Sequence, residues 1–524
     1  MIIKKHCPSC GVIVEVTREF TLPGGAMTVT QYDCGHYAIK KHLTVKDLVL
    51  KSTDGQSSRP FQCEGAKFLI ESDMRALLAD QMGIGKTVQF LMAVHSNPKE
   101  YCPFLGIVKA KLRMQWLKET IRWCGLDFMP QILESEQDFP LPGMSGFLVS
   151  YDLLRRFKDL EAWVKNLGIK TVVMDEVQHI KNHDSKRTNA VRQIVKDVPY
   201  VVGLSGTPIK NHAGEYFPIL NMLHPEKFPS IASYNRDWVD TYWDGFKYRT
   251  GGLKNEPRFK EHTKTFILRR TREEVLPELP AIQRDPLFAD LGPEVEQAYK
   301  DTYTQFKQYY NNSGDATAFE RSTQILAYLS RMRHLAGIAK VGPCVEYVKD
   351  FLEQTDDKII IFVHHRDVGM MLKSQLEVLQ LDNGASKGEA ILTFEADTKD
   401  PAEVQAKFWS GNYRVLIAST LAAGEGLNLQ CCHHVIMLER QWNPANEEQA
   451  EGRIVRMGQL ANKLTAVYMV AVGTVDEFFA ELVERKRSLV DNVMDGKEYS
   501  WDEQSLIKEL AEILAQKGGQ KWGW

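Results

Sequence analysis

Short, continuously apolar runs recur along the chain, and each ends in a polar or glycine-containing turn. The first half carries "FLGIV", "GFLVSY", "TVVMDE" and "YVVGLSG", and the second half carries "KIIIFV", "VLIAST", "HVIMLE" and "TAVYMVA". Unbroken rather than alternating apolarity is typical of strands that are buried on both faces of a sheet. Helix-length segments such as "LRMQWLKETIRWCG" separate these runs, so the pattern predicts an α/β protein with two doubly wound parallel sheets.

The regions between and after these two sheets have a different pattern. Residues 293–339 are mostly helical in pattern, with the polar turn "NNSGD" as a break, and predict a helical insert and linker. The last stretch, "SLIKELAEILAQKGGQKWGW", predicts one amphipathic helix and a glycine-rich tail. We therefore expect a small N-terminal domain at 1–50, α/β domains at 51–275 and 341–495, the insert at 276–340, and the helix with its tail at 496–524.

Length and charge restrict the class of protein. A chain of 524 residues exceeds what one hydrophobic core usually serves, and a 44% hydrophobic content supports two cores. The formal net charge of −3 excludes a polycation, so any nucleic-acid site must be a local patch. Neither an apolar run of about 18 residues nor a secretory signal is evident, which predicts an intracellular, cytoplasmic protein that is neither secreted nor membrane-bound.

The N-terminal region contains two short pairs of potential metal ligands, in "CPSCG" and "DCGHY". Two such pairs on turns are the usual way to build a closed tetrahedral zinc site, so we expect a zinc-ribbon-like domain with a structural Zn²⁺. The predicted ligands are Cys7, Cys10, Cys34 and His36. Either His6 or His42 could replace His36, and ordinary reduced thiols are the alternative.

A glycine turn between a strand and a helix, "LLADQMGIGKTVQF", predicts a nucleotide site. Glycines let backbone N–H groups approach phosphate, and the helix N-terminus adds positive potential. Lys86 would reach the outer phosphates and Thr87 would bind Mg²⁺. The first glycine of the strict phosphate-loop pattern is replaced by an aspartate. The predicted nucleotide-binding residues of this turn are Asp80, Gly83, Ile84, Gly85, Lys86 and Thr87.

A buried strand in "KTVVMDEVQHIKN" delivers two carboxylates that complete such a site. Asp175 would hold Mg²⁺, and Glu176 would orient and deprotonate the attacking water. An ordinary strand that ends in acids is the alternative, but the order of the two elements favours a nucleotide hydrolase.

The stretch "EQAEGRIVRMGQ" places Arg453 and Arg456 three residues apart behind Gln449. At that spacing on a helix the two arginines would share one face, and a solvated charged surface is the simplest interpretation. An arginine brought across from another domain can instead stabilise the negative charge that develops during phosphoryl transfer. Hydrolysis would then depend on closure of the two domains, as a motor requires.

The motifs occur in the order of a known family. The stretches "RPFQ", "DQMGIGKT", "DEVQHIKN", "LSGTPIKN", "FILRRTREEV", "STLAAGEGLNLQ" and "QWNPANEEQAEGRIVRMGQ" resemble those of Swi/Snf-type ATP-dependent DNA translocases of helicase superfamily 2. The elements "RHLAGIAKV" and "FVHH" resemble the compact branch of HepA-related annealing helicases, and this compactness favours a bacterial or viral source. The resemblance covers about residues 59 to 490. It implies two tandem RecA-like domains, with ATP and Mg²⁺ as cofactors.

The resemblance also implies roles for individual residues. Gln62 would contact adenine, and Gln449, Arg453 and Arg456 would form a hydrolysis-sensing helix. Coupling of the nucleotide state to DNA would fall to Ser205, Thr207, Gly424, Gly426 and Asn428. The DNA backbone would be contacted by Lys181, Asn182, Lys210, Asn211, Arg269, Arg270 and Trp442. For Trp442, a plain core tryptophan is an equal alternative.

Three positions depart from the family's pattern. Gln81 stands where the family usually has an acid, Lys109 where it has proline, and Lys111 where a small polar residue is common. The two lysines add positive charge to a loop that is expected to face DNA. We expect their replacement by alanine to weaken DNA binding.

The function most consistent with these motifs is that of a monomeric, ATP-driven translocase on double-stranded or branched DNA. The family grips the sugar-phosphate backbone, so binding should be independent of base sequence and should fall steeply with salt. A strand-separating DNA or RNA helicase is the second hypothesis, which the "LRRT" and "WNP" elements disfavour. A catalytically silent, nucleotide-sensing scaffold is the third, which is disfavoured because the charged groups of the ATP site are all present.

Overall fold

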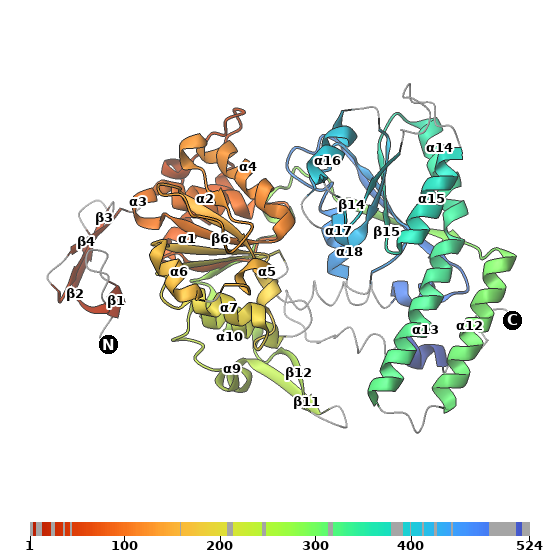
Figure 1. Cartoon of the computed structure of the whole chain (residues 1–524), viewed down its shortest axis with the longest axis horizontal. Helices are drawn as coiled ribbons and strands as arrows, with labels where there is room; N and C mark the ends of the chain where they lie inside the picture. Colours follow the sequence, from red (N-terminus) through yellow and green to blue (C-terminus); the bar gives the residue numbers. More distant parts are fainter. Residues whose placement is uncertain are drawn as a thin grey trace.

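The computed structural model describes most of the chain (Figure 1). The described ranges are 4–6, 13–21, 27–34, 37–41, 44–157, 159–206, 213–243, 248–312, 318–378, 391–398, 400–410, 413–423, 427–441, 444–481 and 510–515. Figure 1 shows a small N-terminal sheet, two α/β domains side by side, and a pair of long helices beside the second domain.

The N-terminal unit is a four-stranded antiparallel sheet in the order β1-β2-β3-β4. Its strands are β1 (Lys4–His6), β2 (Ile13–Thr21), β3 (Met27–Tyr32) and β4 (Tyr37–Lys41). His6 pairs with Ile13, and Val16 pairs with Tyr32. Because the strands alternate in direction, β1 and β3 end at the same edge of this sheet.

The first α/β domain contains a seven-stranded parallel sheet in the order β13-β5-β10-β9-β6-β8-β7. Strands β6 and β8 of this sheet are buried along their whole length, as the unbroken apolar runs predicted. The strands are β5 (Arg75–Leu78), β6 (Phe104–Val108), β7 (Gln131–Ile132), β8 (Gly146–Ser150), β9 (Thr171–Asp175), β10 (Tyr200–Leu204) and β13 (Ile267–Leu268).

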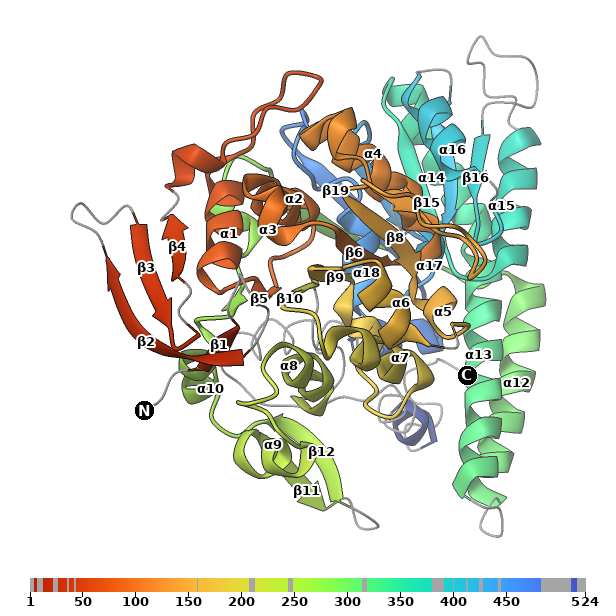
Figure 2. The same cartoon turned by 60° about the vertical axis from the view of Figure 1, so that its left-hand side comes forward.

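Helices cover both faces of this sheet (Figure 2). They are α1 (Pro60–Glu71), α2 (Lys86–Ser96), α3 (Pro98–Tyr101), α4 (Arg113–Cys124), α5 (Tyr151–Leu154), α6 (Leu160–Asn166), α7 (Lys186–Val195), α8 (Phe217–Leu223), α9 (Ile231–Trp238), α10 (Glu256–Thr263) and α11 (Arg272–Val275). A hairpin of β11 (Val239–Trp243) and β12 (Tyr248–Leu253) extends from the domain. The described part of this domain also contains short 3-10 turns, which are η1 (Val45–Leu48), η2 (Ala110–Leu112), η3 (Leu126–Phe128), η4 (Val177–Ile180) and η5 (Ala213–Tyr216).

The second α/β domain has a six-stranded parallel sheet in the order β14-β19-β18-β15-β17-β16. Two parallel-sheet domains therefore confirm the predicted α/β class, and the zinc-ribbon-like N-terminal domain stays a prediction. The strands are β14 (Ile282–Ala289), β15 (Ile359–Val363), β16 (Ile391–Phe394), β17 (Val415–Ser419), β18 (His434–Met437) and β19 (Leu464–Ala471). The helices are α14 (Val341–Gln354), α15 (Arg366–Val378), α16 (Pro401–Trp409), α17 (Thr420–Ala423) and α18 (Pro444–Glu451).

The region between the sheets is not wholly a helical insert. Strand β14 lies in the range that the sequence assigned to the insert, yet it pairs with β19 from Ile282 to Ala289. Two long helices follow it, α12 (Pro293–Asn312) and α13 (Ala318–Ala339), which lie side by side in both views (Figures 1 and 2).

These helices share a small core with the end of the chain. Residues 510–515 are helical, and Leu510 and Leu514 are buried with Tyr299 of α12 and Leu329 of α13.

Within the described part of the chain, none of the helices combines the length and apolarity that crossing a lipid bilayer requires.

Candidate nucleotide site between the two domains

The predicted phosphate-binding turn joins β5 to α2 at the edge where the parallel strands end. Gly83 and Gly85 have φ values of 89° and 83°, a left-handed conformation that glycine adopts at little cost. A Cβ added to Gly85 would lie 2.5 Å from Gln62 Nε2, so no other residue fits there without displacement. The turn ends at Gly85, directly before the N-terminus of α2, where backbone N–H groups favour the binding of anions.

Lys86 lies inside this turn. Its Nζ donates to the backbone oxygens of Asp80, at 2.7 Å, and Gln81, at 3.3 Å. Burial lowers the pKa of Lys86, while the carboxylates of Glu176, Asp80 and Asp175 oppose that shift. The ammonium group is thus held between the turn and the two acids at the end of β9.

Asp175 is the last residue of β9, and its carboxylate is fixed on both oxygens. Trp116 Nε1 donates to Oδ2 at 2.8 Å, and the backbone N–H of Glu176 donates to Oδ1 at 3.0 Å. Tyr151 Oη donates to the backbone oxygen of Asp175 at 2.9 Å. Burial and the neighbouring Glu176 carboxylate raise the pKa of Asp175.

Glu176 has a φ of 51°, a left-handed conformation that is uncommon for a residue with a side chain and that occurs at functional sites. Burial by itself raises the pKa of Glu176, but the charge of Lys86 and the hydrogen bond from Gln178 hold it below its usual value. Glu176 is therefore poised as a carboxylate, which is the form that can accept a proton from water.

A hydrogen-bonded relay connects Glu176 to the end of β10. Gln178 Nε2 donates to Glu176 Oε2 at 2.5 Å, and Ser205 Oγ donates to Gln178 Oε1 at 2.6 Å. Gln178 and Ser205 are buried. Sequence reasoning selected Ser205 but missed Gln178, whose signal is a glutamine next to Val177 in the stretch "DEVQHI" that directly follows the strand. Thr207 lies outside the described residues.

The arginines of the second domain do not share a helix face, contrary to the sequence prediction. Helix α18 carries the half-buried Gln449 and ends at Glu451, and Gly452 begins a series of turns that contains Arg453 and Arg456. Glycine is a poor continuation for a helix, which explains the early end.

These turns nevertheless lie against the nucleotide turn of the first domain. A Cβ on Gly83 would be 3.1 Å from the Val455 oxygen and 3.6 Å from Arg456 Cγ. Arg272 Nη1 of the first domain also donates to the Val455 oxygen at 3.4 Å.

Arg453 and Arg456 interact electrostatically with each other and with Glu176 at this contact between the domains. Burial and the charge of Arg453 lower the pKa of Arg456 to about 9, and Glu176 opposes that shift. The charge of Arg453 also contributes to the low pKa of Glu176. The structure therefore brings Arg453 and Arg456 to the acids that the sequence assigned to hydrolysis.

The predicted coupling loop is described only in part. Asn428 Oδ1 accepts a hydrogen bond from Arg456 Nη1, and the Asn428 oxygen accepts one from Trp409 Nε1 at 2.9 Å. Gly424 and Gly426 lie outside the described residues. Asn428 thus joins the loop after β17 to the arginine that faces the nucleotide turn.

Asp80 and Arg270, predicted to contact nucleotide and DNA, form an ion pair within the first domain. Arg270 Nη2 and Nε donate to the Asp80 carboxylate at 2.6 and 3.2 Å, and Gln89 Nε2 donates to it at 3.1 Å. Arg270 Nη1 donates to the Phe61 oxygen at 2.8 Å. The Asp80 carboxylate and the Arg270 guanidinium are therefore engaged with each other behind the turn, and their predicted contacts with nucleotide and with DNA stay predictions.

Gln62 and Ile84, also predicted to contact nucleotide, make contacts within the first domain. Gln62 Oε1 accepts from the Arg59 N–H at 2.9 Å, and Gln62 Nε2 donates to the Ile84 oxygen at 3.3 Å. The Ile84 side chain is buried with Phe61 and Leu276. These two hydrogen bonds fix the orientation of the Gln62 amide and leave one N–H and one oxygen lone pair for contact with a base.

Some of the residues predicted to contact DNA are bound to other groups of the first domain, whereas Asn182 is exposed. Lys181 Nζ is paired with the buried Glu215 at 2.7 Å, while Asn182 is exposed. Arg269 Nη1 donates to the Ala79 oxygen at 3.3 Å. The charge of Lys109 lowers the pKa of Glu176, which places that lysine toward the nucleotide turn. Lys210, Asn211 and Trp442 lie outside the described residues.

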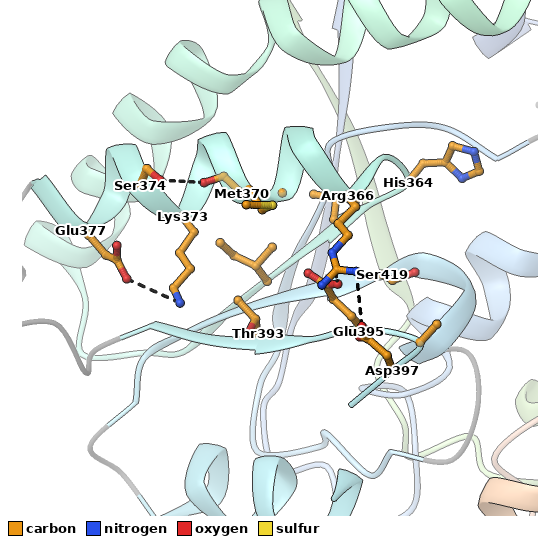
Figure 3. Close-up of a pocket in the computed structure, with 14 residues that line it drawn as sticks. His364, Arg366, Met370, Lys373, Ser374, Glu377, Thr393, Glu395, Asp397 and Ser419 are labelled. Atoms are coloured by element: carbon orange, nitrogen blue, oxygen red, sulfur yellow. Dashed lines mark hydrogen bonds and ion pairs between the residues drawn. The ribbon is translucent and has the colours of Figure 1, made fainter. Parts of the chain in front are cut away.

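Lys111 reaches the second domain beside a cavity of about 740 Å³. Its Nζ donates to the Ala396 oxygen at the rim. Figure 3 shows the cavity between α15 and β16, where Arg366 spans to Glu395 at 2.9 Å and to Asp397 at 3.3 Å. The loop before α4 therefore forms a second contact between the domains.

The structure describes the residues predicted to bind Mg²⁺, but only one of the four residues predicted to bind Zn²⁺. Asp175 and Thr87 supply oxygen ligands of the kind that Mg²⁺ prefers, at the open nucleotide turn. No group of three or more metal-binding side chains is found among the residues that the structure describes. Cys34 is exposed in the turn after β3, and the other predicted zinc ligands, Cys7, Cys10 and His36, lie outside the described residues, as does the alternative His42.

Two protein families match the two α/β domains. Residues 61–337 match the SNF2-related domain, and residues 343–458 match the helicase conserved C-terminal domain.

Curated relatives include the Mus musculus protein named DNA annealing helicase and endonuclease ZRANB3, which is 26% identical over 456 residues, covering 84% of this chain and 41% of the relative. The Xenopus laevis SWI/SNF-related matrix-associated actin-dependent regulator of chromatin subfamily A-like protein 1 is 26% identical over 461 residues, covering 84% of this chain and 45% of the relative. The chain thus spans less than half the length of these relatives. A solved structure titled Sulfolobus solfataricus SWI2/SNF2 ATPase core in complex with dsDNA aligns at 25% identity and a TM-score of 0.39, covering 88% of this chain and 96% of that one.

Proposed function

The chain belongs to the SNF2-related family, and from this premise we propose that it is a DNA-dependent ATPase that moves along double-stranded DNA. The observation that carries the proposal is the contact between the domains, where the turn of Arg456 in the second domain lies on Gly83 of the first. A site assembled from two domains makes hydrolysis depend on their relative position, which is how a motor converts chemistry into movement.

Each charged group has a role in this proposal. Lys86 and the N–H groups of the glycine turn bind the phosphates. Thr87 and Asp175 hold Mg²⁺, which when bound neutralises the charge on the phosphate oxygens. Glu176, held by Gln178, accepts the proton of the attacking water.

Arg453 and Arg456 complete the site by stabilising the charge that spreads over the departing phosphate. The ion pair of Asp80 and Arg270 stabilises the conformation of the glycine turn.

DNA is the proposed track for two reasons. The mouse relative carries the name of a DNA annealing helicase, although the chain spans only 41% of that relative. The relay from Glu176 through Gln178 to Ser205 also connects the hydrolytic carboxylate to the segment that follows β10, where contact with a track could be sensed. We propose remodelling of duplex or branched DNA without recognition of base sequence.

Steady-state ATP hydrolysis tests this function. The protein is assayed without nucleic acid and with single-stranded DNA, duplex DNA, forked DNA and RNA, beside a Glu176→Gln variant. We expect stimulation by duplex or forked DNA that the variant loses. Stimulation by single strands or RNA alone would replace the proposal with a strand-separating helicase, and absence of hydrolysis under all conditions would replace it with a silent scaffold.

We also propose that the motor is a monomer and that the N-terminal sheet binds a structural Zn²⁺. Both halves of the ATP site come from one chain, which supports a monomer, and sedimentation velocity would reveal a dimer.

The proposed zinc site lies at one end of the N-terminal sheet. Strands β1 and β3 both end there, so the segments that carry the two ligand pairs start from the same side. Metal analysis should find one zinc per chain, lost in Cys10→Ser, and a zinc-free preparation made without chelator would refute this proposal.

A further inference from the structure

Trp116 is a buried aromatic residue whose polar atom donates to the carboxylate of Asp175. The side chain is 3% exposed, and its ring lies 6.1 Å from that of Phe90, centroid to centroid. Its Nε1–H is a donor without acceptor capacity, and it donates to Asp175 Oδ2 at 2.8 Å. A hydrogen bond between a neutral donor and a carboxylate is among the stronger ones in proteins.

Trp116 and the Glu176 N–H hold the two oxygens of Asp175 from opposite sides. Without the indole N–H, the structure would leave this carboxylate one of these two hydrogen bonds, the one that the Glu176 backbone N–H donates to Oδ1 at 3.0 Å. The carboxylate could then rotate about its last bond, because terminal sp³–sp² torsions are broad. Only a carboxylate in a fixed rotamer presents its free lone pairs to a metal in one direction.

We propose that Trp116 is a positioning residue of the Mg²⁺ site, which sets the orientation of Asp175 without touching metal or nucleotide. This inference rests on the proposed ATPase function. A neutral donor suits this role, because a cation at the same place would compete with Mg²⁺ for the carboxylate.

Helix α4 makes Trp116 a rigid support. The Thr120 hydroxyl donates to the Trp116 oxygen at 2.8 Å within this helix, and Arg113 Nη1 ties its start to the Leu133 oxygen at 2.7 Å. The helix continues directly from η2, whose Lys111 contacts Ala396 of the second domain. The support of Asp175 therefore begins about one and a half turns from a contact between the domains.

A Trp116→Phe variant tests the inference, because it removes the N–H and keeps an aromatic ring. Trp123→Phe is the matched control: Trp123 lies in the same helix and is buried, but its Nε1 donates to Glu119 Oε2 at 3.1 Å. For each variant, the affinity for a fluorescent ATP analogue is measured in EDTA and over a range of Mg²⁺ concentrations. The Mg²⁺ concentration that half-saturates hydrolysis is measured beside it.

We expect Trp116→Phe to raise the half-saturating Mg²⁺ concentration about tenfold, the smaller end of the effect of losing a hydrogen bond to a charged group. Its affinity in EDTA should stay within about twofold of the wild type, and Trp123→Phe should match the wild type in both measurements. An unchanged Mg²⁺ dependence in Trp116→Phe, an equal loss in Trp123→Phe, or weaker binding in EDTA would overturn the inference and leave Trp116 a packing residue. A wild-type protein that binds no nucleotide in Mg²⁺ would instead overturn the proposed function, and with it this inference.

Discussion

The ion pair of Asp80 and Arg270 gives a sharp test of how the nucleotide turn is held in shape. We consider Arg270→Met, which keeps much of the side-chain volume and removes the charge. Asp80 is fully buried, and the substitution would leave Gln89 Nε2, at 3.1 Å, as the donor that the structure still gives its carboxylate. Arg270 contributes two hydrogen bonds to that carboxylate and one each to Gln89 and the Phe61 oxygen.

The expected cost follows from the burial of the pair. Removal of one partner of a buried ion pair leaves an uncompensated charge and destabilises by about 3–5 kcal/mol. With a urea m-value of about 3 kcal/mol/M, a loss of about 4 kcal/mol lowers the unfolding midpoint of the first domain by about 1.3 M. Asp80→Asn in the Arg270→Met background removes the buried charge, so the double variant should recover about half of the loss.

Urea unfolding followed by tryptophan fluorescence measures these midpoints. Arg269→Met is the control, because Arg269 makes one hydrogen bond to a neutral backbone oxygen at 3.3 Å, and its loss should cost less than about 1.5 kcal/mol. A loss of less than about 1 kcal/mol for Arg270→Met, or a double variant less stable than the single one, would refute the view that the pair with Arg270 stabilises the turn at Asp80.

Three further predictions concern the second domain and its contact with the first. Gly337→Ala would place a Cβ 2.8 Å from Glu439 Oε1, so we expect a loss of about 1–3 kcal/mol in thermal unfolding, whereas Gly342→Ala, with nothing within 4 Å, should be neutral or stabilising. Burial lowers the pKa of His434 to about 4, so the unfolded chain binds the extra proton below about pH 6.5. Stability should therefore fall between about pH 6.5 and 4, and His434→Asn should flatten that fall in melting temperature. Lys111→Ala should weaken duplex binding and reduce the slope of log affinity against log salt by about 0.9, measured by fluorescence anisotropy, and an unchanged slope would restrict Lys111 to its contact with the second domain.

Local patterns predicted the parts of the site that lie within one short stretch. The glycine turn with Lys86 and the strand that ends in Asp175 and Glu176 each combine a buried strand with a change of backbone direction, which the sequence displays directly. The two parallel sheets were likewise legible from unbroken apolar runs. Strand β14 was missed because it is an edge strand with an interior proline and many exposed positions, and edge strands tolerate both.

Contacts between distant segments could not be read in the same way. Asp80 and Arg270 are 190 residues apart, and Trp116 and Asp175 are 59 residues apart, so only the fold brings each pair together. The shared helix face of Arg453 and Arg456 was a wrong inference from spacing, because Gly452 ends the helix first. The arginines still reach the nucleotide turn, since their place is set by the packing of the two domains.

The junction of α13 and α14 has a mechanical consequence. Lys340, at this junction, is 1% exposed and pairs with Asp476 just after β19, so the end of α13 is pinned to the second sheet. A helix of 22 residues is about 33 Å long at 1.5 Å per residue. A rotation of the second domain by about 10° would then sweep the far tip of α13 through about 6 Å. The helical pair would act as a lever arm that amplifies each stroke of the ATP cycle, and a partner or DNA segment bound at its tip would move by that distance.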